Sequence, residues 1–149
     1  MNLQSQINGE IKNAMKTKDT LALDTLRAIK SAILLAQTES GAKEELSKDD
    51  EIKLLQRLVK QRKESARIYT EQGREDLAQP EVEQAKIIEK FLPQQLSEDR
   101  IKEIVSQIIT DLGVSGMASM GQVMAEANKR MAGQADGKTI STVVRSLLV

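Results

Sequence analysis

Residues 60–97 read KQRKESARIYTEQGREDLAQPEVEQAKIIEKFLPQQLS, and this stretch decides the fold. It holds the end of the clearest helical stripe in the chain, a glycine at position 73 that can end a helix, and a proline-containing linker. We predict that the linker, residues 93–96, separates an N-terminal helical domain (1–92) from a small C-terminal domain (97–149).

The N-terminal domain is predicted to contain about four helices. The first spans 3–15, and the second runs from an N-cap at Asp19 to about residue 39, before a loop over 39–46. The third runs from a cap at Ser47 to Gly73, and the fourth covers about 74–91. Pro80 lacks a backbone donor, so we expect the fourth helix either to break there or to begin there. The expected inward residues are Leu3, Ile7, Ile11 and Met15; Leu23, Leu26, Ile29, Ile33 and Leu34, with Leu35 beside them; Ile52, Leu55, Val59, Arg62, Ala66 and Tyr69; and Val82, Ala85, Ile88 and Leu92.

The C-terminal domain is predicted to be a three-helix bundle. Ser97 caps a helix through about residue 112, a second helix covers 117–131 and stops at Gly133, and Asp136 caps a third. Their inward residues are Ile101, Ile104, Val105, Ile108, Ile109 and Leu112, and Ile140, Val143, Val144, Leu147 and Leu148. No stretch alternates with period two, so the fold class is all-α.

Composition excludes several kinds of site. The chain has 149 residues with 22 basic against 22 acidic, so no overall field selects a charged partner. It has no Cys and no His, which removes thiolate chemistry, the usual zinc ligands and the commonest general base. The only aromatics are Tyr69 and Phe91. We expect no catalytic residue, metal, cofactor or membrane contact, and a cytoplasmic location.

Arg62 is the unusual residue of the third predicted helix, because the residues three and four positions away from it are apolar or small and place it on the partly buried face. A buried guanidinium needs a carboxylate partner. We expect a structural ion pair that fixes helix register, with Glu81, Glu83 or Glu89 as the partner; a ligand-anchoring role is the alternative.

Two groups of basic residues have the spacing for phosphate contacts. On the third helix, a strip that Glu64 interrupts lies on the outer face: Lys53, Arg57, Lys60, Lys63 and Arg67. After Glu126 the balance becomes basic, with four cations against Asp136 alone: Lys129, Arg130, Lys138 and Arg145. An ordinary solvated surface is the competing interpretation of both groups.

Three other motifs have simpler interpretations. Residues 133–139 resemble a phosphate loop, but only three residues separate the glycines and no strand precedes them, so a helix stop followed by an Asp cap explains them better. The acidic run 49–51 is expected to serve a helix start and not a cation. Met117, Met120, Met124 and Met131 are expected in the core, with a binding groove as the alternative.

Six segments together resemble the stand-alone YqeY proteins, over nearly the whole chain and in the right order. They are LRAIKSAI (26–33), KQRKESA (60–66), GREDLA (73–78), LPQQLS (92–97), MGQVM (120–124) and ADGK (135–138). YqeY proteins are similar to the tail of GatB, a subunit of the tRNA-dependent amidotransferase.

The resemblance implies a non-catalytic accessory module that binds tRNA or a tRNA–enzyme complex, although the family is classed with carbon–nitrogen ligases that use glutamine as amide donor. The RNA-binding candidates are Lys129, Arg130, Lys138 and Arg145, with Arg67 and Arg74 adding to them. Gln122 and Gln134 stand where the family often carries a basic residue. The alternatives are a protein-interaction domain that uses the Met-lined helix 117–131 and, third, an independent amidotransferase.

Overall fold

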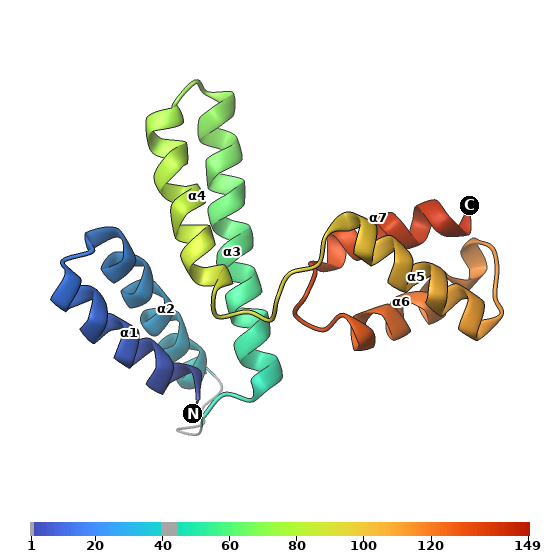
Figure 1. The fold of residues 1–149 in the computed structure, drawn as a ribbon, viewed down its shortest axis with the longest axis horizontal. Coiled ribbons are helices and arrows are strands. Elements are labelled where there is room, and N and C mark those ends of the chain that lie inside the picture. The colour runs from blue at the N-terminus through green and yellow to red at the C-terminus, as the bar shows by residue number, and fades with distance from the viewer. Residues whose placement is uncertain (1, 40–44) are drawn as a thin grey trace. The chain divides into compact units, whose positions relative to one another are not determined.

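The computed structural model of the chain describes residues 2–39 and 45–149 (Figure 1). These residues form seven α-helices and one short 3-10 helix, and they contain no strand, so the predicted all-α class is confirmed. In chain order the elements are α1 (Leu3–Thr17), α2 (Thr20–Glu39), α3 (Lys48–Glu71), α4 (Glu75–Glu89), α5 (Glu98–Leu112), η1 (Met117–Ser119), α6 (Met120–Arg130) and α7 (Gly137–Leu148). The loop expected over 39–46 lies mostly outside the described residues.

Side-chain caps set the starts of several helices, as the sequence predicts. Asp19 Oδ1 accepts from the Ala22 amide at 3.1 Å, and Ser47 Oγ accepts from the Asp50 amide at 3.1 Å. In the C-terminal part, Ser97 Oγ accepts from the Arg100 amide and Asp136 Oδ1 from the Thr139 amide. Each cap satisfies one amide that the first helical turn leaves without a partner.

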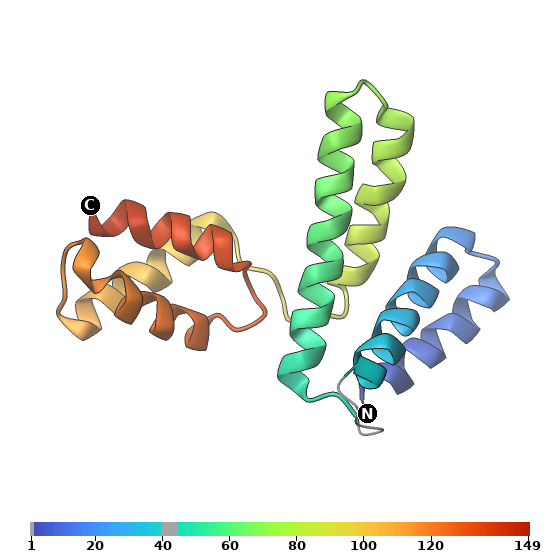
Figure 2. The same cartoon turned by 180° about the vertical axis from the view of Figure 1, so that it is seen from behind.

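Each of the two compact units, residues 1–92 and 93–149, has its own apolar core. In the first, α1 packs on α2 and α3 packs on α4 (Figure 1, Figure 2). Every helix of this unit contributes a fully buried side chain: Ile7, Ile29, Leu55 and Ile88. In the second, Ile108 of α5, Val123 of α6 and Val144 of α7 are fully buried. Each buried Val or Ile stabilises its unit by about 1.5–3 kcal/mol.

Four residues that were predicted to face inward are exposed: Met15, Leu34, Leu35 and Leu147, the last of which is 39% exposed. Met15 is 56% exposed and Ala14 is buried in its place. Steps of four residues rotate about 40° each around a helix, so a stripe that begins at Leu3 has left the buried face by Met15. Leu34 and Leu35 are 45% and 59% exposed, because they lie to the side of the stripe that Leu26, Ile29 and Ile33 define.

The prediction that α4 breaks or begins at Pro80 is wrong. The helix begins at Glu75 and continues through Pro80, which lies in its second turn. A proline there lacks the amide that would bond to the carbonyl four residues earlier, and its ring crowds that carbonyl, but the apolar face of α4 packs on α3 along both sides of this position. Tertiary packing therefore outweighs the local cost of proline.

Gly73 ends the α3 region, as predicted. Its φ is +72°, and the amide of Arg74 returns to the carbonyl of Tyr69 at 2.8 Å. A left-handed residue at this position closes the last turn, and glycine adopts it without steric cost. The C-terminal helix expected over 117–131 instead begins with a 3-10 turn, η1, before α6 starts at Met120.

The segment expected to be a linker is tied to the C-terminal unit. Gln95 Nε2 donates to the carbonyl of Pro93 at 2.8 Å and to that of Gly133 at 2.7 Å. The Leu96 amide donates to the carbonyl of Gln134 at 2.9 Å. These bonds attach residues 93–96 to the turn between α6 and α7.

Candidate nucleic-acid interface

Four of the six RNA-binding candidates are exposed cations of the C-terminal unit, and three of these four have no ion-pair partner among the described residues. Lys138 is in the first turn of α7 and Arg145 lies seven residues further, so the two project from one face of that helix. Lys129 is in the last turn of α6. Within residues 2–39 and 45–149 none of the three forms an ion pair. We call Lys129, Lys138 and Arg145 the C-terminal cations.

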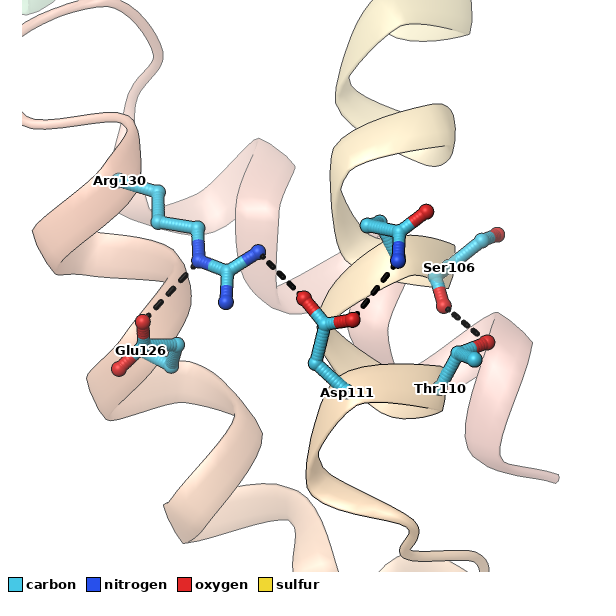
Figure 3. Close-up of polar contacts among 6 residues, drawn as sticks. Ser106, Thr110, Asp111, Glu126 and Arg130 are labelled. Carbon is cyan, nitrogen blue, oxygen red and sulfur yellow. Dashed lines mark hydrogen bonds and ion pairs between the residues drawn. The ribbon is translucent and has the colours of Figure 1, made fainter.

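Arg130, beside Lys129, is held by two carboxylates (Figure 3). Its Nε donates to Glu126 Oε1 at 3.0 Å on the same helix, and its guanidinium donates to Asp111 Oδ2 at 3.1 Å on α5. The bond to Glu126, followed by that to Asp111, raises the pKa of Arg130. A phosphate would have to compete with both carboxylates for this side chain.

Asp111 is held in its charged form by the same network. Its Oδ1 accepts from Gln107 Nε2 at 2.7 Å, and its Oδ2 accepts from Arg130, a bond that Figure 3 shows. The bond from Gln107 and then that from Arg130 lower the pKa of Asp111 below its usual value of 3.8. The network joins α5 to α6 by charge and hydrogen bonds as well as by apolar packing.

The two N-terminal candidates are also paired, both within exposed local clusters. Arg67 donates hydrogen bonds to Glu64 and Glu71 on α3, and its bonding to Glu64 is the main cause that raises its pKa. Arg74 donates twice to Asp76, at 3.0 Å from both Nε and Nη2. That pairing raises the pKa of Arg74 and lowers that of Asp76. A bidentate carboxylate satisfies the geometry that a phosphate would otherwise use.

Arg62 does not form the predicted ion pair with a carboxylate of α4. Its Nε donates to the side-chain oxygen of Gln84 at 3.1 Å. Arg62 is half-buried, and a guanidinium that keeps part of its hydration needs no formal counter-charge. The neighbouring Lys63 makes the contact with α4 instead, through Glu89 at 2.9 Å. The position still links α3 to α4, but through an amide.

The basic strip of α3 is divided by these pairings. Its C-terminal end is neutralised, because Lys63 is paired with Glu89 and Arg67 with two glutamates. In the described ranges Lys53, Arg57 and Lys60 form no ion pair, and all three are exposed. We call these three the α3 strip. Beside it lies an open hollow of about 520 Å³, whose lining includes Lys53 and Arg57.

The other motifs have structural roles. Residues 131–135 form turns and bends and Asp136 caps α7, which confirms the predicted helix stop and Asp cap. The acidic run Asp49–Glu51 occupies the first turn of α3, as predicted. In the part of the chain that the structure describes, no three His, Cys, Asp or Glu residues gather as metal ligands, and no helix is long and apolar enough to cross a membrane.

The methionines of the 117–131 region divide between core and surface. Met131 is completely buried, and Met120 and Met124 pack partly buried against the core. Met117 is 44% exposed in η1, which contacts α7, where Leu147 is also exposed. The core assignment therefore holds for three of the four methionines, and Met117 is on the surface.

Sequence reasoning identified the cations but not which of them are available. The pair between Arg130 and Asp111 joins positions nineteen residues apart, and no local spacing predicts it. The strip on α3 was recognised by its spacing, but Lys53, Arg57 and Lys60 were not among the candidates. Acids three and four positions away are the local signal that predicts the pairing of Arg67 and, through Glu126, that of Arg130.

Comparison with known proteins gives one family. The family model described as "Yqey-like protein" matches residues 4–148. The chain is 29% identical to "Altered inheritance of mitochondria protein 41, mitochondrial" of Clavispora lusitaniae, over 97% of this chain and 86% of that protein. It is 33% identical to the protein of the same name from Meyerozyma guilliermondii, over 82% of this chain and 68% of the relative.

A third relative is a larger protein, of which the matching region is a part. The chain is 28% identical to a glutamyl-tRNA(Gln) amidotransferase subunit of Thermococcus gammatolerans, over 77% of this chain but only 20% of that relative. The expected resemblance to a tRNA amidotransferase is thus found with a protein that is several times longer than the matching region.

Proposed function

The chain belongs to the family of Yqey-like proteins, and from this premise we propose that it is a non-catalytic helical module that binds tRNA or a tRNA–enzyme complex. The observation that carries the proposal is the region shared with a component of a glutamyl-tRNA(Gln) amidotransferase. A region that matches a fifth of that component is the size of an appended module, and function in such a module lies on its surface.

The C-terminal cations support the proposal. Lys129, Lys138 and Arg145 are exposed and, among the described residues, without a carboxylate partner, so phosphate contacts would displace only water and counterions. Arg130, Arg67 and Arg74 are less suitable, since each would first have to leave a carboxylate. We assign the main contacts to the first three.

Binding of fluorescently labelled tRNA to the full chain, followed by anisotropy at about 50 and 200 mM salt, tests the proposal. Each phosphate contact changes the slope of log K against log salt by about 0.7–0.9. The variant Lys129→Gln/Lys138→Gln/Arg145→Gln should therefore lower the slope by about 2–3 and weaken binding. Arg67→Gln, which removes an arginine already paired, is the control and should change binding little. No binding of the unaltered chain at 50 mM salt would contradict the proposal.

A second candidate function is protein interaction through the 117–131 region. The observation in its favour is that Met117 and Leu147, on contacting elements, are both exposed apolar side chains. Met117→Ser/Leu147→Ser should then abolish copurification of a protein partner under conditions that remove RNA, and leave tRNA affinity unchanged. An independent amidotransferase, the third candidate, would require the pure chain to release glutamate from glutamine.

The cytoplasmic location stays a prediction. The names of the Clavispora and Meyerozyma relatives place those proteins in mitochondria. Fractionation of cells that express the tagged chain would decide between the two compartments.

A further inference from the structure

We infer that the α3 strip, Lys53, Arg57 and Lys60, is a second phosphate-contacting site, which binds the sugar–phosphate backbone of an RNA on the N-terminal unit. The inference rests on the proposed function. It extends that function, because none of these three residues is among those assigned to RNA contacts above. Three observations support it: the spacing of the three cations on α3, the pairing of the nearby acids, and the hollow beside the strip.

The three cations form a line on the outer side of α3. Spacings of four and three residues keep them within about 60° of one another around the helix, at steps of about 6 and 4.5 Å along its axis. The buried residues of the same helix, Leu54, Leu55, Leu58, Val59 and Ala66, lie on the opposite side. The strip therefore faces away from the core that α3 shares with α4, and its side chains need no rearrangement to meet a ligand.

In the described ranges no carboxylate forms an ion pair with Lys53, Arg57 or Lys60. Glu64 follows Lys60 by one turn, but it is bonded to Arg67 through both of its oxygens. Asp49 and Asp50 precede Lys53 in the first turn of α3, where the partial positive charge of the helix end favours them. Among the described residues, three exposed cations that neighbour one another on the helix face therefore have no ion-pair partner. This pattern differs from that of a solvated face, on which opposite charges alternate along the helix.

The hollow beside the strip gives the ligand a shape to fit. Its lining includes the apolar side chains of Ala36 in α2, Leu46, and Leu54 in α3, together with the cations Lys53 and Arg57. Glu39 and Asp50 line the same hollow and repel phosphate, so the backbone would lie toward Lys60. The carboxylates can instead accept hydrogen bonds from amino groups of bases. The combination suits a nucleic acid better than a small inorganic anion.

A set of charge-matched variants of the full chain tests the site. The strip variant is Lys53→Gln/Arg57→Gln/Lys60→Gln. Its control, Lys63→Gln/Arg67→Gln/Lys86→Gln, removes three cations of the same unit that are already paired with Glu89, Glu64, Glu71 and Glu83. Both variants change the net charge by three. A third variant removes the three C-terminal cations, on which the proposed function depends.

We expect the strip variant to weaken tRNA binding at least tenfold at 50 mM salt and to lower the slope of log K against log salt by about 2–3. The control should change the slope by less than about 1. Lysine acetylation of the unaltered chain, measured by mass spectrometry with and without tRNA, is a second test, which does not depend on the folding of a variant. Bound tRNA should reduce acetylation of Lys53 and Lys60 and leave that of Lys16 unchanged.

The outcomes separate this inference from the proposed function. If the C-terminal variant loses affinity and the strip variant keeps the affinity and slope of the unaltered chain, the strip is not a site, although the proposed function stands. Equal losses in the strip variant and its control would also overturn the strip, because net charge alone would then explain both. If the unaltered chain does not bind tRNA at low salt, the proposed function and the strip fail together.

Discussion

Arg130 of α6 and Asp111 of α5 are nineteen positions apart in the sequence, and their charged groups meet at 3.1 Å. Within the described part of the C-terminal unit, this is the ion pair that connects two helices. This ion pair gives the RNA-binding candidate Arg130 a structural partner, and it should make the stability of the C-terminal unit depend on pH.

The substitution Asp111→Asn should make the C-terminal unit less stable near neutral pH and equally stable in acid. The folded state lowers the pKa of Asp111 below 3.8, first through Gln107 and then through Arg130. A lowered folded-state pKa contributes stability above the unfolded value, and this contribution is lost as the pH falls through the folded value. Thermal unfolding from about pH 7 to pH 2 measures it. Both groups are exposed, so the difference should be small and should shrink in high salt. Asp24→Asn on α2 is the control; a difference that persists at pH 2 would contradict the assignment.

Replacement of the proline inside α4 should stabilise the N-terminal unit. Pro80→Ala restores a helical amide in the second turn of α4 and removes a ring from a helix interior, so we expect a gain of about 1–3 kcal/mol. Urea unfolding followed by circular dichroism measures it. Gln79→Ala, at an exposed neighbouring position, should change stability by less than about 0.5 kcal/mol. A loss of stability in Pro80→Ala would show that the proline acts mainly by restricting the unfolded chain.

Two glycines of the N-terminal unit should respond in opposite directions to alanine. Gly73 has a φ of +72°, where a side chain is strained, so Gly73→Ala should cost about 1–2 kcal/mol. Gly9 is in the middle of α1 with nothing near the position of an added Cβ, so Gly9→Ala should stabilise by about 0.5–1 kcal/mol. The same alanine at two sites is the comparison, measured by urea unfolding. Changes of the same sign would be inconsistent with the two backbone conformations.

The two cores should respond separately to truncation. Ile88 and Ile108 are both completely buried, one in each unit, and replacement of either by alanine should cost about 2–5 kcal/mol. We expect amide exchange to accelerate in α1 to α4 for Ile88→Ala and in α5 to α7 for Ile108→Ala. Leu35→Ala, at an exposed position, is the control. Acceleration throughout the chain in either variant would mean that the units unfold together.

The sequence predicted the helices well because their signals are local. Ser47, Ser97 and Asp136 cap helices where expected, since a cap needs only its own turn. Inward faces were predicted less well. Leu34 and Leu35 are as apolar as Leu26, and only the helix rotation and the position of the neighbouring helices decide which of them is covered.

Available charge could not be predicted from the chain alone. Whether Arg62 meets a carboxylate or Gln84 depends on the register between α3 and α4, and whether Arg130 is available depends on where α5 ends. Both contacts are determined by tertiary structure. The spacing of Lys53, Arg57 and Lys60 is a property of the sequence, but their lack of ion-pair partners among the described residues depends on how neighbouring helices place their acids.

Gln95 extends the C-terminal unit backwards past the start of α5, through its bonds to Pro93 and Gly133. A truncated fragment that starts at Ser97 would lack the hydrogen bonds of Gln95, whereas one that starts at Pro93 would retain them. If the C-terminal unit can be fused as a domain to other proteins, the fused segment has to include the four residues before Ser97.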